Sequence, residues 1–136
     1  MNLQPWFIDA GHWIALLNRG DQLHERARRL NATLRGRLVT TEAVLTEVGN
    51  WMARPPLRAL VAPFLHRVHS NPHLEIVAVD HELFARAVTF FTSRADKDWG
   101  LTDCISFVVM QDRGITEALS ADVHFVQAGF RALLRE

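Results

Sequence analysis

The amino-acid sequence predicts an α/β domain in which a central parallel sheet carries helices on both faces. Short apolar runs that suit strands alternate along the chain with segments of helical periodicity, an alternation typical of parallel α/β folds. The chain has 136 residues, of which 49% are hydrophobic and 22% charged, as in an ordinary globular domain. Since no internal repeat or Gly/Ser-rich linker interrupts it, we expect a single domain over residues 1–136.

Five short segments are predicted to be strands. The first stops at an acid, Asp9, and the second ends in two threonines. The third is rich in β-branched residues, as a buried parallel strand should be. The fourth is followed directly by Asp122, and the last is expected at the edge of the sheet. In chain order these segments are residues 6–8, 38–41, 74–79, 117–121 and 132–134.

Six segments are predicted to be helices. The second is polar and rich in arginine, and Thr41 can cap the third, whose apolar residues recur at helical spacing. Asp80 can cap the fifth. The sixth starts at Thr102, is apolar nearly all round and ends at Gly114, so it is expected in the core. In chain order the helices cover residues 10–17, 22–34, 41–52, 57–68, 80–91 and 102–113.

Composition excludes several classes of protein. Cys104 is the one cysteine, so an intrachain disulfide or a cysteine zinc cluster is impossible, and we expect a cytoplasmic protein. The first ten residues do not form a signal peptide, and the longest apolar run, residues 59–65, contains a proline, so no membrane span is expected. Fifteen basic residues offset fifteen acidic ones, which argues against indiscriminate coating of nucleic acid.

Charge is nevertheless unevenly distributed along the chain. Residues 19–74 hold nine arginines against four acids, whereas residues 75–136 hold six basic residues against ten acids. The sequence therefore predicts a charge-segregated surface.

Two acids, Asp9 and Asp122, follow predicted strands, where loops of a parallel sheet converge on ligands. They would form a shared metal pocket, or each would merely cap the helix that follows it. Asp80 has an equally good local pattern and is expected to be only a cap.

Glu47 and Asp103 are the other candidate acids. At helical spacing Glu47 lies on the edge of a buried stripe, whereas Glu42 falls on the opposite face. A carboxylate there needs compensation by a metal ion or by a neighbouring arginine. Asp103 stands in the first turn of the most apolar helix, where the helix dipole alone would also favour an acid.

Together the four acids suit an oxygen-only site for Mg²⁺ or Mn²⁺ rather than zinc. The seven histidines include no paired metal motif and are interpreted as surface residues or caps. No GxGxxG or P-loop motif is present, and Ser106 lacks the GxSxG surroundings of a hydrolase nucleophile.

Four segments around these acids resemble the PIN-domain family, and within it the VapC-like toxins of toxin–antitoxin pairs. They are FIDAGHWIALLN, VTTEAVLTEVGNW, WGLTDCISFVVM and ALSADVHFVQAGF, and they span nearly the whole chain in the family's order. Two positions depart from the usual pattern, Gly100 where relatives often carry serine and Val123 where they often carry a basic residue. Neither removes a carboxylate.

The resemblance implies a PIN fold and a metal-dependent endoribonuclease with Mg²⁺ or Mn²⁺ as cofactor. The family's acidic quartet falls on Asp9, Glu47, Asp103 and Asp122. We expect Asp9 and Asp103 to be the principal metal ligands, with the other two as further ligands, direct or through water. Hydroxyl residues nearby would support the ligands by hydrogen bonds or would simply cap and pack. These residues are Thr102, Ser106 and Ser120.

A ribonuclease also needs a surface for RNA. Arg26, Arg28 and Arg29 lie on the Arg-rich second helix, which would bind the phosphate backbone or form a solvated face. Three tryptophans are candidates to stack a base, although burial is the expected fate of the first two. They are Trp13, Trp51 and Trp99.

The resemblance further implies a VapB-like antitoxin and a homodimer. The antitoxin's C-terminal segment would lie along the domain and direct a basic side chain into the carboxylates. The Trp13 helix or residues 57–65 would supply the dimer interface.

Two other functions compete with this one. A signalling receiver would need a lysine after its last strand, but the one lysine, Lys97, lies in a loop before a helix, which rejects that class. A PIN-like binding or scaffold module without catalysis remains the alternative, and an incomplete acidic set would favour it.

Overall fold

The computed structural model describes residues 4–136 and contains a five-stranded parallel sheet in the order β3-β2-β1-β4-β5. Residues pair in parallel register across every neighbouring pair of strands, for example Phe7 with Val39 on one side and with Ala118 on the other. The strands are β1 (Trp6–Ile8), β2 (Leu38–Thr41), β3 (Leu74–Val77), β4 (Glu117–Leu119) and β5 (Arg131–Ala132).

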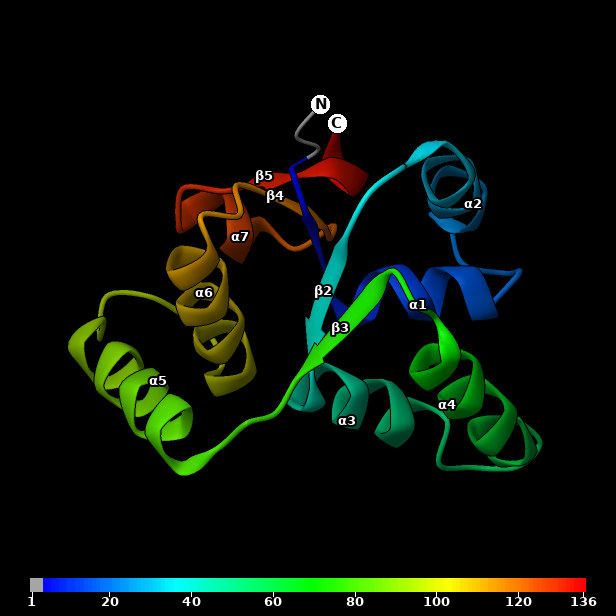
Figure 1. Cartoon of the computed structure of the whole chain (residues 1–136), viewed down its shortest axis with the longest axis horizontal. Helices are drawn as coiled ribbons and strands as arrows, with labels where there is room; N and C mark the ends of the chain where they lie inside the picture. The colour runs from blue at the N-terminus through cyan, green and yellow to red at the C-terminus, as the bar shows by residue number, and fades with distance from the viewer. Residues whose placement is uncertain (1–3) are drawn as a thin grey trace.

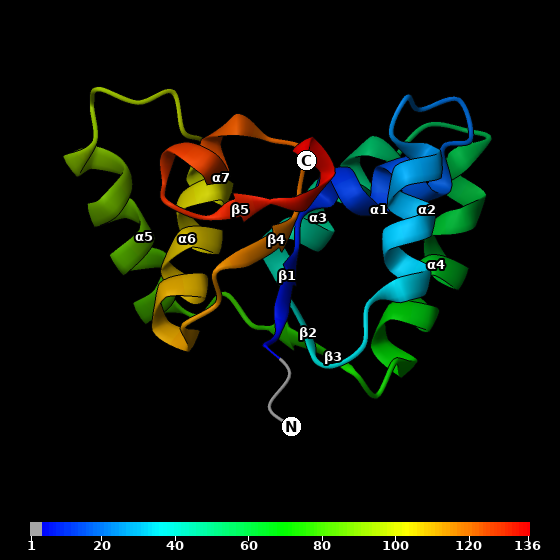
Figure 2. The same cartoon turned by 90° about the horizontal axis from the view of Figure 1, so that it is seen from above.

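Helices cover both faces of this sheet, so the predicted fold class is confirmed (Figures 1 and 2). Seen from above, α5, α6 and α7 lie on one side of the strands, and α1, α2 and α4 lie on the other (Figure 2). The α-helices are α1 (Ala10–Leu17), α2 (His24–Thr33), α3 (Glu42–Trp51), α4 (Val61–Ser70), α5 (His81–Ser93), α6 (Leu101–Arg113) and α7 (Val123–Gln127). Within residues 4–136, none of them is long and apolar enough to cross a bilayer.

Local signals in the sequence position several of these helices as expected. The Thr41 hydroxyl accepts a hydrogen bond from the Val44 amide at 3.1 Å and caps α3. The Asp80 carboxylate accepts one from the Leu83 amide at 2.8 Å and caps α5. Gly114 ends α6 with a φ of 64°, a left-handed conformation that glycine adopts without strain.

Four predicted elements are shorter than expected or divided in the structure. β3 and β4 are shorter than expected, because the chain leaves the sheet after Val77 and after Leu119. The predicted last strand, 132–134, is a strand only at Arg131–Ala132 and continues as a short 3₁₀ helix, η2 (Leu133–Arg135). The predicted helix 57–68 is divided into a 3₁₀ turn, η1 (Leu57–Leu60), and α4.

The core is centred on α6, as its sequence predicts. Phe107 of this helix is fully buried, and its ring packs edge-on against Trp99 at 5.2 Å and against Phe125 at 5.0 Å between centroids. Trp99 is only 4% exposed, so the suggestion that it stacks a base is wrong. Trp13 is also buried, against the ring of Phe64.

The C-terminal turn is tied to the segment that follows β4. The amide of Leu134 donates to the carbonyl of Ser120 at 3.1 Å, and the guanidinium of Arg135 donates to the carbonyl of Ala121 at 3.1 Å. Arg26 of α2 donates to the carbonyl of Leu133 at 3.2 Å. These bonds fix the chain immediately before Asp122.

The strand order places the site. From β1 the chain proceeds outward through β2 to β3, and later returns to add β4 and β5 on the other side of β1. The order therefore reverses between β1 and β4. In open parallel sheets this reversal is where the loops after neighbouring strands part and leave room for a ligand.

Candidate metal centre

The four predicted acids come from four elements: two follow the strands on either side of this reversal point, and two stand on helices. Asp9 directly follows β1, and Asp122 lies three residues beyond β4. Asp103 stands in the first turn of α6 and Glu47 in the middle of α3. The charges of Asp103 and Glu47 raise the pKa of Asp9, and those of Asp103 and Asp122 raise the pKa of Glu47, so the four carboxylates act on one another electrostatically.

Asp9 is buried, and its side chain does not cap α1. Instead its Oδ2 accepts a hydrogen bond of 2.8 Å from the hydroxyl of Ser120. The pKa of Asp9 is raised from 3.8 to about 7. Burial is the largest cause, the charges of Asp103 and Glu47 add to it, and hydrogen bonds from Ser120 and from the Ala10 backbone act against it. The simple capping interpretation of Asp9 is therefore wrong.

Glu47 is exposed as a residue, yet its pKa is also raised. Partial loss of solvation is the largest cause, followed by the charges of Asp103 and Asp122. Glu42 points elsewhere, since its carboxylate accepts a hydrogen bond of 2.8 Å from the amide of Val79. The two glutamates of α3 thus face different surroundings, as their helical spacing predicts: Glu47 faces the other acids, and Glu42 faces Val79.

Asp103 joins two elements. Its Oδ2 accepts a hydrogen bond of 3.0 Å from the backbone amide of Gly100, the residue before α6. The same oxygen lies 3.0 Å from Nδ1 of His124 on α7. Gly100 therefore serves the site through its amide, which a serine at this position would retain.

Asp122 is a cap as well as a site residue. Its Oδ1 accepts a hydrogen bond of 2.9 Å from the amide of His124, in the first turn of α7. Its own amide donates to the hydroxyl of Ser120 at 3.0 Å. The capping interpretation of this residue is therefore confirmed, and its role in a metal pocket stays a prediction.

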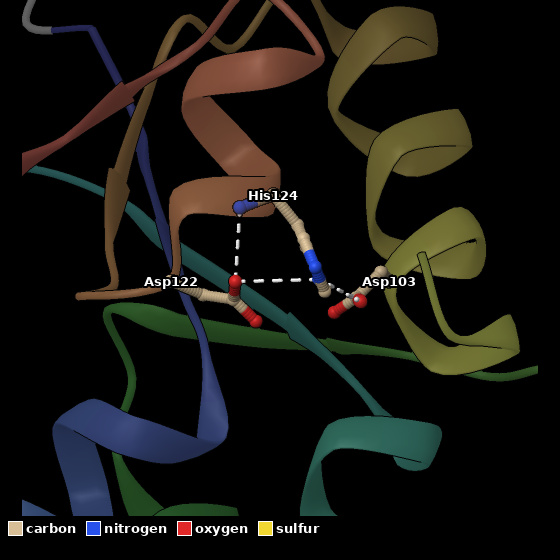
Figure 3. Close-up of side chains that lie close together, drawn as sticks. All are labelled: Asp103, Asp122 and His124. Carbon is tan, nitrogen blue, oxygen red and sulfur yellow. Dashed lines mark hydrogen bonds and ion pairs between the residues drawn. The ribbon is translucent and has the colours of Figure 1, made fainter. Parts of the chain in front are cut away.

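His124 is the site residue that sequence reasoning missed, because the histidines were interpreted as surface residues or caps. Its side chain is 24% exposed, and its Nδ1 lies between Asp103 and Asp122, 3.3 Å from Oδ1 of the latter (Figure 3). Ligand atoms of these three residues all lie within 4.8 Å of one another. The signal in the sequence was its position two residues after Asp122, on the helix that Asp122 caps.

The three hydroxyl residues differ in their contacts. Ser120 is fully buried and joins Asp9 to the backbone of Asp122, as described above. Ser106 is buried too, but its hydroxyl donates to the carbonyl of Thr102 at 3.1 Å, within α6. Among the hydrogen bonds of residues 4–136, none joins the side chain of Thr102 or Ser106 to a carboxylate of the site.

The donor set fits a divalent cation. In the described part of the chain, no arginine or lysine forms an ion pair with any of the four acids; Asp103 and Asp122 pair with His124 alone. A neighbouring arginine was the alternative to a metal for Glu47, and no such pair occurs in residues 4–136. Four carboxylates without a fixed arginine or lysine counter-charge, two of them (Asp9 and Glu47) with raised pKa values, suit a hard cation such as Mg²⁺ or Mn²⁺.

The arginines proposed for RNA have unequal roles. Arg26 is partly buried and is bonded to the C-terminal turn, as described above. Arg28 is exposed and pairs with Glu25 at 2.5 Å on the same helix, and Arg29 is exposed. Two of the three side chains therefore lie on the open surface of α2.

Comparison with known proteins gives consistent matches over almost the whole chain. A model of the PIN domain matches residues 6–131. The 23S rRNA-specific endonuclease VapC20 of Mycobacterium tuberculosis, from strains CDC 1551 and H37Rv, is 33% identical over 125 residues, which cover 91% of this chain and 94% of the relative.

Solved structures match the fold. The crystal structure of Mycobacterium tuberculosis VapC20, described as a sarcin-ricin loop cleaving toxin, superposes with a TM-score of 0.83 at 27% identity, covering 91% of this chain and 95% of that one. VapBC2 of Rickettsia felis, bound to a DNA fragment from its promoter, gives a TM-score of 0.67 at 11% identity, covering 94% and 96%. The second likeness bears on the fold alone.

Proposed function

This chain belongs to the PIN-domain family, and on that premise we propose that it is a metal-dependent endoribonuclease acting as the toxin of a toxin–antitoxin pair. One observation carries the proposal: the chain is 33% identical to an endonuclease toxin over 91% of its length, and it carries all four acids, Asp9, Glu47, Asp103 and Asp122, around the reversal point of its sheet. An incomplete cluster would have favoured the alternative, a binding module without catalysis.

We propose ribosomal RNA as the substrate class. The relative is specific for 23S rRNA, and its crystal structure is described as that of a toxin that cleaves the sarcin-ricin loop. The exposed arginines of α2, Arg28 and Arg29, are candidates to bind the phosphate backbone.

We propose that Asp9, Glu47, Asp103 and Asp122 hold Mg²⁺ or Mn²⁺. In phosphodiester hydrolysis such an ion supplies activation of water and neutralisation of charge on the leaving oxygen. The protein's own contribution is positional. Ser120 and Gly100 donate hydrogen bonds that orient Asp9 and Asp103. Glu47 has a raised pKa and an exposed position, so it is suited to orient or deprotonate the attacking water.

A toxin of this kind requires restraint in its own cell, and we propose a VapB-like antitoxin and a homodimer as its partners. The acids lack an arginine counter-charge within residues 4–136, so a basic side chain from the antitoxin would find a complementary site there.

The test is cleavage of purified 23S rRNA and of intact ribosomes, mapped by primer extension. We expect one dominant cut with Mg²⁺ or Mn²⁺, no cut in EDTA, and loss of at least a hundredfold in rate for Asp103→Asn. Asp80→Asn is the matched control, because Asp80 also follows a strand but caps α5 outside the site. Equal activity of wild type and Asp103→Asn, or cleavage that EDTA does not affect, would contradict the proposal.

A further inference from the structure

The ring of His124 bridges two aspartates from different parts of the chain. Nδ1 lies 3.0 Å from Oδ2 of Asp103 on α6 and 3.3 Å from Oδ1 of Asp122, the cap of α7 (Figure 3). Both neighbours are carboxylate oxygens, which accept hydrogen bonds. Nδ1 must therefore carry the proton and act as the donor.

The hydrogen bonds at both aspartates fall on one oxygen of each. Oδ2 of Asp103 accepts from Gly100 and from His124, and Oδ1 of Asp122 accepts from the amide of His124. Among the hydrogen bonds of residues 4–136, the other oxygens, Oδ1 of Asp103 and Oδ2 of Asp122, accept none. One oxygen of each carboxylate thus remains available to a cation.

We propose that His124 is a positioning residue for the metal centre: its Nδ1–H donates to Asp103, its backbone amide donates to Asp122, and with Nδ1 beside both carboxylates it holds them in a fixed relative arrangement that leaves their second oxygens for the ion. The inference deepens the proposed function and rests on it. Because a protonated nitrogen has no lone pair to offer, Nδ1 does not bind the ion itself. The contribution of His124 is to order the two carboxylates before the ion arrives, so that less conformational freedom is lost when the ion binds.

Three substitutions separate this role from the alternatives. In His124→Asn the side-chain amide nitrogen takes nearly the position of Nδ1 and can donate to the same oxygens. In His124→Gln the amide nitrogen takes nearly the position of Nε2, so the bridge is lost although polarity and size are kept. His124→Ala removes the group altogether. His66→Ala is the matched control, since His66 is exposed on α4.

The experiment is titration of the metal-free protein with Mn²⁺ by calorimetry, with a melting curve in EDTA for every variant. We expect His124→Ala and His124→Gln to bind Mn²⁺ about tenfold to a hundredfold more weakly than wild type, the usual range for residues that orient ligands. His124→Asn should retain affinity within about threefold, and His66→Ala should match wild type. Melting temperatures in EDTA show whether each variant still folds. If His124→Ala does not fold, the comparison of His124→Asn with His124→Gln still tests the inference.

Pulsed electron paramagnetic resonance of the Mn²⁺ complex gives an independent readout. We expect no directly coordinated ¹⁴N in the wild-type spectrum. A directly bound nitrogen that disappears in His124→Asn would overturn the inference, because His124 would then be a ligand. Wild-type affinity in His124→Gln and His124→Ala would overturn it as well. Failure of the wild-type protein to bind Mn²⁺ would overturn the proposed metal-dependent function together with this inference, so the two failures are distinguishable.

Discussion

Ser120 donates a hydrogen bond of 2.8 Å from its hydroxyl to Asp9, and both side chains are buried. The two residues follow neighbouring strands, β1 and β4, and are separated by 111 positions in sequence. The bond therefore depends on the pairing of β1 with β4. It also orients the buried carboxylate of Asp9.

Loss of this bond should weaken both stability and metal binding. We expect Ser120→Ala to lower the free energy of unfolding by about 1–3 kcal/mol, because the buried Asp9 loses a donor. Mn²⁺ affinity should fall about tenfold, as is usual when a residue that orients a ligand is removed. Urea unfolding and calorimetry measure the two effects. Ser93→Ala, at an exposed serine of α5, is the control; equal behaviour of the two variants would contradict the role of Ser120.

Asp9 itself should destabilise the metal-free protein at neutral and alkaline pH. Its pKa rises from 3.8 to about 7 on folding, so the folded state binds the Asp9 proton more tightly than the unfolded state does. The stability that this proton contributes is fully present below pH 3.8 and is lost as pH rises through about 7. We expect Asp9→Asn to be more stable than wild type in EDTA at pH 8, by up to about 4 kcal/mol, and similar near pH 4. Urea unfolding at the two pH values measures the difference. If Asp9→Asn were less stable than wild type at pH 8, burial of the charged Asp9 carboxylate would not destabilise the metal-free protein as described.

His12 should give the opposite pH dependence. It is fully buried on α1, its Nε2 lies 3.3 Å from Oδ1 of Asn31, and burial lowers its pKa from 6.5 to about 4. The stability it contributes is therefore present above pH 6.5 and lost as pH falls toward 4, by about 3 kcal/mol.

The variant His12→Leu isolates this share. Between pH 7 and pH 4 its free energy of unfolding should fall less steeply than that of wild type. Because both proteins contain Asp9, the contribution of Asp9 cancels when the two curves are subtracted. Urea unfolding followed by tryptophan fluorescence measures both curves. Parallel curves would mean that His12 does not titrate as described.

The arginines of α2 should separate into structural and RNA-binding roles. Arg26→Gln removes the bond to Leu133 and should lower the free energy of unfolding by about 1–3 kcal/mol. The double variant Arg28→Gln/Arg29→Gln should melt like wild type but bind RNA more weakly. Its salt dependence should fall by up to about 0.7 in slope for each phosphate that an arginine no longer neutralises. An unchanged slope would indicate that this face of α2 is merely solvated.

Much of the site could be predicted from local sequence. Asp9 and Asp122 stand after apolar strands, and the spacing on α3 distinguishes Glu47 from Glu42. The strand order could not be predicted in this way, because the pairing of β1 with both β2 and β4 depends on tertiary packing and not on any local sequence pattern.

The placement of three other side chains could not be predicted from the sequence, because it depends on contacts with distant parts of the chain. α7 has only five residues, too few for helical periodicity to show that His124 points toward Asp103. Trp99 lies in a charged loop, which suggested exposure, but contact with the rings of Phe107 and Phe90 buries it. Arg26 looked like its exposed neighbours because its partner, the carbonyl of Leu133, lies 107 positions away.

The most direct test of the metal centre is anomalous X-ray scattering from crystals of this protein grown or soaked with Mn²⁺. We expect a strong anomalous peak within bonding distance of carboxylate oxygens of Asp9 and Asp103, and its absence in crystals of Asp103→Asn treated in the same way. A peak elsewhere on the protein, or none in wild-type crystals in which these side chains are well ordered, would contradict the assignment of these acids as metal ligands.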